Sequence, residues 1–120
     1  MDAFEKIYVN GVYIIAVNLS RSTIREAYEF RKVIEEEINA GHTDIIIDLS
    51  KCDYLDSTFF GGIMWALTKM TDIGKKLKLI KPGNPKEDIF LTTNTARFFD
   101  FYKTREDALK SFGEDILPEN

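Results

Sequence analysis

The stretch IIIDLSKCDYLDSTFFGGIMWALTKM, residues 45–70, contains the pattern that decides the fold. It begins with a run that is apolar at every position, as in a central strand covered on both faces. After a short polar loop comes a helix expected over residues 58–73 and ended by Gly74. Asp56, Ser57 and Thr58 lie at the join, where aspartate, serine and threonine are preferred helix caps. The stretch therefore predicts a strand, a loop and a helix, with small polar side chains at the helix start.

The flanking sequence supplies the other elements. Asn10-Gly11 splits two apolar stretches and is a strong hairpin signal. Residues 21–40 have helical periodicity, with Thr23 and Glu26 as a capping box near the start and Gly41 at the end. The remaining expected elements are strands in residues 75–81 and 96–103, a helix capped within Asn84-Pro85-Lys86-Glu87, and a last helix from Thr104 to about Phe112. The order predicts an α/β fold, a central mixed β-sheet of about five strands packed with about four α-helices.

Composition narrows the classes of protein that are possible. The chain has 120 residues, which suits one domain, expected over residues 1–113 with a loose tail over 114–120. Its net charge of -4, with both signs interspersed, argues against direct nucleic-acid binding. The longest apolar run, residues 12–17, is far too short for a membrane span, and the start lacks the pattern of a secretory signal. A single cysteine fits a reducing compartment, so we expect a cytoplasmic protein without membrane insertion.

The residues offer no convincing catalytic or metal-binding constellation. His42 has no cysteine or carboxylate at metal-ligand spacing, and Ser57 lacks the Gly-x-Ser-x-Gly elbow of a hydrolase. Cys52 has only Lys51 as a local basic group, which favours a structural thiol. Gly61-Gly62 lacks the lysine and the spacing of a phosphate-binding loop. We therefore expect no enzymatic activity, no cofactor and no metal.

The second helix has two distinct sides when it is wound at about 100° per residue. Phe60, Ile63 and Leu67 form part of a core stripe, and the opposite side carries Gly61, Trp65 and Thr68. The winding places Trp65 outward without apolar neighbours of its own. It is then covered by another element, a lone exposed aromatic side chain, which is common, or part of a protein contact, where tryptophan is enriched.

Ser57 also has two interpretations. As a cap residue it needs no further function to explain it. As an exposed hydroxyl beside the Gly61 and Trp65 face, it is a candidate phosphorylation site. A partner docked on that face would then meet about two new negative charges.

The chain as a whole resembles the STAS domain family, in particular bacterial anti-sigma factor antagonists. The most specific part is IIIDLSKCDYLDSTFFGG, which is similar to the family's strand, Asp-Leu-Ser, apolar pair, Asp-Ser-Ser/Thr and helix start. Residues 72–109 resemble the family's second half. Phe59 stands where the family usually has glycine, and residues 19–23 lack the family's common Gly-x-Leu-Asp run.

This resemblance implies a small binding protein without catalysis of its own. Its unphosphorylated form would bind an anti-sigma serine kinase and thereby free a sigma factor. Phosphorylation of Ser57, with Thr58 as the second choice, would release it, and a PP2C-type phosphatase would reset it. The resemblance also leaves open a scaffold subunit of a stress-signalling assembly or transport system, and a small α/β enzyme or nucleotide binder is a further alternative. The expected partner-binding residues are Asp56, Ser57, Thr58, Gly61, Trp65 and Thr68.

Overall fold

The first two strands form the predicted hairpin. A computed structural model describes residues 2–40, 43–83 and 88–116, the last three for the backbone alone. Strands β1 (Phe4–Val9) and β2 (Val12–Val17) pair antiparallel, with Val9 opposite Val12. Asn10 and Gly11 join them with φ angles of 51° and 81°. Both angles lie in the left-handed region that the tight hairpin turn requires, so the prediction from Asn-Gly is confirmed.

The central strand is the apolar run with which the decisive stretch begins. The main sheet has the order β1-β2-β4-β6-β7, with β4 at Asp44–Asp48, β6 at Leu77–Ile80 and β7 at Asp100–Tyr102. Only the β1–β2 pair is antiparallel. Three consecutive isoleucines of β4, residues 45–47, are completely buried. Burial of side chains on both faces confirms the expected central strand in a mixed sheet.

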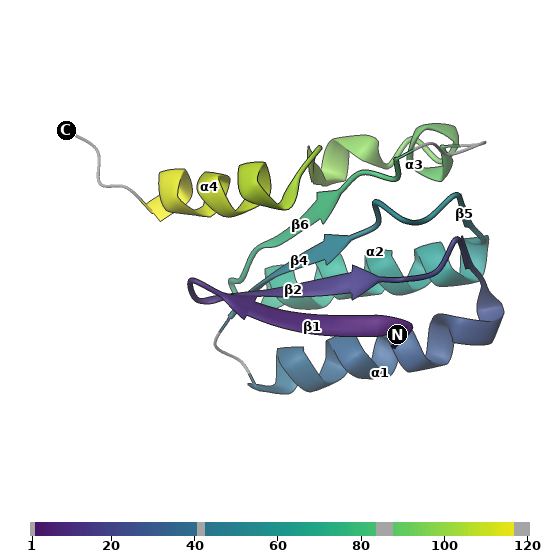
Figure 1. Cartoon of the computed structure of the whole chain (residues 1–120), viewed down its shortest axis with the longest axis horizontal. Coiled ribbons are helices and arrows are strands. Elements are labelled where there is room, and N and C mark those ends of the chain that lie inside the picture. Colours follow the sequence, from purple (N-terminus) through teal and green to yellow (C-terminus); the bar gives the residue numbers. More distant parts are fainter. Residues whose placement is uncertain (1, 41–42, 84–87, 117–120) are drawn as a thin grey trace.

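Helices cover the sheet on both faces (Figure 1). Helices α1 (Ile24–Ala40) and α2 (Ser57–Asp72) lie side by side on one face, and α4 (Arg105–Ile116) lies on the other. The short helix α3 (Ile89–Thr92) follows β6. The larger core lies under α1 and α2, and α4 closes a smaller core with Ala108 and Phe112. The five-stranded mixed sheet and four α-helices agree with the predicted fold class.

Several element boundaries differ from the predictions. The helix expected from residue 21 begins at Ile24, because Arg21–Ser22 form β3, which pairs in parallel with β5 (Tyr54–Leu55). Two residues are too short for a strand pattern to be visible in the sequence. The predicted capping box is present, since the Thr23 amide donates to Glu26 Oε1 at 3.1 Å.

The second half of the chain shows two further differences. Of the strand expected over residues 96–103, only β7 is extended, and Ala96–Phe98 form a 3₁₀ turn. Helix α4 continues past Phe112 and ends at Ile116. The domain boundary expected at residue 113 stays a prediction. The predicted ends and caps at Gly41 and Asn84–Glu87 lie outside the described residues, and the cap of α3 is Asp88.

Candidate functional site

Asp56 joins the starts of two helices. The β3–β5 pair brings residue 22 beside residue 55, and the Asp56 amide donates to the Ser22 carbonyl at 3.0 Å. Its carboxylate Oδ1 accepts from the Phe59 amide of α2 at 2.8 Å. Its Oδ2 accepts from the Ile24 amide of α1 at 2.7 Å. One carboxylate therefore caps both helices and holds their first turns side by side.

Ser57 and Thr58 occupy the first turn of α2 with exposed side chains. Because Asp56 is the N-cap, the Ser57 hydroxyl is not needed for that role. Within the described ranges, neither hydroxyl makes a hydrogen bond to another side chain or to the backbone. The capping explanation for Ser57 is therefore wrong, and its role as a phosphorylation site stays a prediction.

The two hydroxyls face a groove between α1 and α2 with a volume of about 470 Å³. The α1 wall carries Ile24 and Tyr28, which are 66% and 79% exposed. A Cβ added at Gly61 would meet nothing within 4 Å, whereas one at Gly62 would lie 3.4 Å from Phe30. Gly62 thus lies against the Phe30 ring of α1 with room for ordinary van der Waals contact, and Gly61 leaves the groove open. The residues lining the groove are Ile24, Ala27, Tyr28, Arg31, Ser57, Thr58, Gly61 and Gly62.

The α1 wall was not expected from the sequence. Ile24 and Tyr28 lie four residues apart on one helical face, which is a visible signal of an apolar ridge. However, their periodicity alone does not say which helix lies beside them. The pairing of α1 with α2 in the fold makes these residues neighbours of Ser57.

Trp65 does not have the surroundings expected for it. The side chain is half-buried and packs against the core under α1 and α2. The expectation of a ring without apolar neighbours is therefore wrong, and the alternative that another element covers the ring is confirmed. The Arg31 guanidinium carbon lies 4.3 Å from the centre of its ring. Helix α1 covers the ring because it packs alongside α2, which the winding of one helix cannot reveal. A role of Trp65 in partner binding stays a prediction.

Thr68 lies apart from the groove. Its exposed hydroxyl donates to the Met64 carbonyl at 3.1 Å. It lines a second hollow of about 400 Å³ with Met64, Leu67 and Phe98. Of the predicted surface, Ser57, Thr58 and Gly61 therefore line the groove, and Thr68 lines this second hollow about two turns further along the same face of α2.

Phe59 belongs to an aromatic cluster beneath the groove. Its side chain is completely buried, with its ring centre 4.5 Å from that of Phe30 and 6.3 Å from that of Phe4. The cluster joins α1, α2 and β1. A large side chain at this position therefore fills the core and leaves the exposed face of the first turn unchanged.

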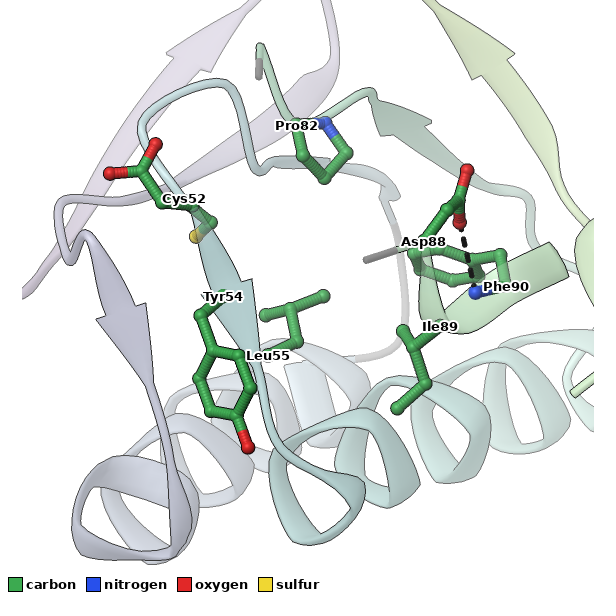
Figure 2. A pocket seen from close by; sticks show the side chains of 8 residues that line it. Cys52, Tyr54, Leu55, Pro82, Asp88, Ile89 and Phe90 are labelled. Atoms are coloured by element: carbon green, nitrogen blue, oxygen red, sulfur yellow. Dashed lines mark hydrogen bonds between the residues drawn. The ribbon is translucent and has the colours of Figure 1, made fainter. Parts of the chain in front are cut away.

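The other candidate groups named from the sequence are Cys52 and His42. Cys52 is buried with its Sγ 3.4 Å from Ser22 Oγ, and burial raises the pKa of its thiol to about 11. The cavity beside it, drawn in Figure 2 with Tyr54, Pro82 and Phe90, has a volume of about 10 Å³, the space of one water molecule. His42 lies outside the described residues.

The described residues contain neither a candidate metal cluster nor a candidate membrane span. Residues 2–40, 43–83 and 88–116 contain no group of three or more histidine, cysteine, aspartate or glutamate side chains placed to hold a metal ion. In the same part of the chain, each helix is too short or too polar to cross a bilayer.

Comparison with known proteins gives consistent results. The STAS domain family matches residues 8–108. A Thermotoga neapolitana protein, assigned as an anti-sigma factor antagonist, is 30% identical over 103 residues, which are 85% of this chain and 90% of that protein. The crystal structure of a Thermotoga maritima protein with the same assignment has a TM-score of 0.81 at 27% identity, covering 90% of this chain and 92% of its own.

A more distant likeness concerns the fold alone. Bacillus SpoIIAA in its phosphorylated form has a TM-score of 0.72 at 17% identity, covering 92% of this chain and 99% of its own.

Proposed function

Because this chain belongs to the STAS domain family, with relatives assigned as anti-sigma factor antagonists, we propose that it is a phospho-regulated anti-sigma factor antagonist. In this proposal the unphosphorylated form binds an anti-sigma serine kinase through the groove between α1 and α2. The bound kinase releases its sigma factor. Phosphorylation of Ser57 then separates the two proteins, and a PP2C-type phosphatase restores the binding form. The role places the protein in the cytoplasm and requires no catalysis by its own residues.

The observation that carries this proposal is the free hydroxyl of Ser57 at the head of a partly apolar groove. Ile24 and Tyr28 offer apolar surface for a partner, and the open side of Gly61 lets its backbone or side chains approach. In protein interfaces a few residues, often aromatic ones, carry most of the binding energy, and Tyr28 is such a candidate here. Ser57 is positioned where any group added to it would enter the contact.

The chemistry of the switch is a phosphoryl transfer to Ser57 Oγ. The O–H bond of the serine breaks and its proton goes to a base of the kinase. A bond forms from Ser57 Oγ to the γ-phosphorus of ATP as the bond from that phosphorus to the β–γ bridging oxygen breaks, and ADP leaves. The product carries a charge of about −1.5 to −2 near pH 7. Hydrolysis of the same bond by the phosphatase returns the hydroxyl.

The free energy that the switch requires can be compared with the cost of burying the phosphate. A near-complete switch needs the phosphate to favour the free state by roughly 5.5 kcal/mol. Taking a doubly charged group out of water costs several kcal/mol per ion, so a close contact over Ser57 suffices. A phosphate that remained in water would have a much smaller effect.

The test combines phosphorylation with binding measurements. A candidate anti-sigma serine kinase and ATP are incubated with the protein, and the product is examined by intact mass and phosphopeptide mapping. We expect one phosphoryl group on Ser57, none in Ser57→Ala, and normal modification in Thr58→Ala. Modification of Thr58 alone, or of neither residue, would contradict the assignment. An unmodified protein that instead enters a large assembly would favour the scaffold role.

Titration calorimetry against the same kinase tests the groove. Ser57→Asp should bind more weakly than the unmodified protein but more tightly than the phosphorylated one, because aspartate supplies one charge and no tetrahedral oxygens. Tyr28→Ala should weaken binding, whereas Thr68→Ala, in the separate hollow, serves as the matched control. Unchanged binding of Tyr28→Ala would place the contact outside this groove, and a loss in Thr68→Ala as well would extend the contact to the second hollow.

A further inference from the structure

The groove that contains Ser57 has a cation, Arg31, that forms no ion pair with the described residues. Arg31 is exposed, lines this groove together with Ser57 and Thr58, and lies over the ring of Trp65. In the described part of the chain its guanidinium has no carboxylate within ion-pair distance. The side chains that line the groove include one cation and no acidic group.

Several backbone amides at the two helix starts already have acceptors within the protein. Helix N-termini bind phosphate through their first free amides. Here the Ile24 and Phe59 amides donate to the Asp56 carboxylate, and the Arg25 amide donates to Thr23 Oγ1 at 3.2 Å. A phosphate on Ser57 would also be repelled by the charge of Asp56 next to it in the chain. The charge of Asp56 therefore directs the phosphate away from the carboxylate and into the groove that Ser57 lines.

Of the nearby cations, Arg31 is the one placed to meet it. It follows Ile24 by seven residues and therefore lies on the same face of α1, the face that borders the groove. Arg25 projects about 100° around the helix and is not among the groove residues. Arg21 lies on β3, and its guanidinium carbon is 4.5 Å from the ring centre of Tyr54.

We propose that Arg31 leaves the ring of Trp65 and binds the phosphate on Ser57 within the same molecule. This inference rests on the proposed phosphorylation of Ser57. A guanidinium binds a phosphate through two parallel charge-assisted hydrogen bonds, which are stronger than the contact of an exposed cation with an aromatic face. The pairing draws the phosphate over the groove and uncovers Trp65. Phosphorylation thus fills the docking groove with the protein's own side chain as well as adding charge to it.

The experiment uses full-length protein with phosphoserine incorporated translationally at position 57, so that no kinase is needed. The second pKa of the phosphate is measured by ³¹P NMR titration in the wild-type background and in Arg31→Gln, Arg31→Lys and Arg21→Gln. An adjacent guanidinium favours the dianion, so this pKa should be lower in the wild-type background than in Arg31→Gln by roughly half a pH unit or more. Arg21→Gln, the matched guanidinium–aromatic control, should titrate like wild type, and Arg31→Lys should be intermediate because it keeps the charge but loses the fork.

Trp65 is the single tryptophan of the chain and provides a second measurement. Its emission should shift to longer wavelength when Ser57 is phosphorylated, and Arg31→Gln should show the shifted emission with or without the phosphate. Equal phosphate pKa values in the wild-type and Arg31→Gln backgrounds would overturn the proposal, as would an effect confined to Arg21→Gln. If the titration is as expected but no kinase modifies Ser57, the proposed function fails while the assignment of Arg31 stands.

Discussion

Replacing Asp56 by asparagine should destabilise the protein more than the same replacement of Asp88, although both residues cap helices. The two oxygens of Asp56 serve different helices, Oδ1 the Phe59 amide and Oδ2 the Ile24 amide. Asp88 uses a single oxygen, Oδ1, for both the Phe90 and the Leu91 amides, and Figure 2 shows the first of these bonds. An asparagine side chain keeps one carbonyl oxygen. It can therefore replace Asp88 fully but can serve only one of the two helices at position 56.

The magnitudes follow from the number of amides left without an acceptor. Asp56→Asn should cost roughly 1 to 2 kcal/mol, for one lost cap bond and an NH₂ group that faces a backbone N–H. Asp56→Ala removes both caps and should cost roughly 2 to 3 kcal/mol. Asp88→Asn should stay within about 0.5 kcal/mol of wild type.

Urea unfolding followed by circular dichroism measures these differences. With a slope of about 2 kcal/mol per molar urea, Asp56→Asn should lower the midpoint by roughly 0.5 to 1 M at unchanged slope. Hydrogen exchange of the Ile24 and Phe59 amides should both accelerate in Asp56→Ala. Equal midpoints for Asp56→Asn and Asp88→Asn would refute the reasoning, because the bond to α1 would then contribute nothing.

Three further predictions concern single residues. Burial raises the pKa of the Cys52 thiol to about 11, so the thiol should react slowly with a thiol reagent at pH 8 and rapidly in urea. Fast labelling of the native protein would contradict this burial. Burial tends to raise the pKa of Asp48, but hydrogen bonds from Ser50 and then Arg105 hold it below the ordinary value. The ionised Asp48 therefore contributes fully to the free energy of unfolding above about pH 5, and this contribution is lost as the pH falls through the lowered native pKa. Asp48→Asn should consequently lose less stability than wild type in an acid titration, and identical stability profiles for the two proteins would argue against the pairing with Arg105. Gly61→Ala should raise the free energy of unfolding by about 0.5 to 1 kcal/mol, because the position is helical and open. Gly61→Trp should fill the groove and reduce the affinity for the partner at least about tenfold in calorimetry. Unchanged affinity of Gly61→Trp would exclude the groove as the contact.

The sequence by itself determined the elements whose cause is local. The Asn10-Gly11 turn depends on two residues that tolerate positive φ, and the central strand depends on three isoleucines in a row. The start of α2 depends on Asp56 and an amide three residues later. Each of these follows from spacings of a few residues, so pattern and propensity suffice to predict them. The strand–loop–helix unit and the positions of Ser57 and Thr58 at its join were predictable for the same reason.

Only the tertiary structure decided what surrounds those residues. The second oxygen of Asp56 binds an amide 32 residues earlier in the chain, and the β3–β5 pair that brings them together is too short to leave a pattern. Whether Trp65 faces solvent depends on α1 lying beside α2, which places Arg31 over its ring. Ile24 and Tyr28 become part of the candidate site for the same reason. Helical periodicity gives the direction of a side chain relative to its own axis, but the order of strands in the sheet decides which helix becomes its neighbour.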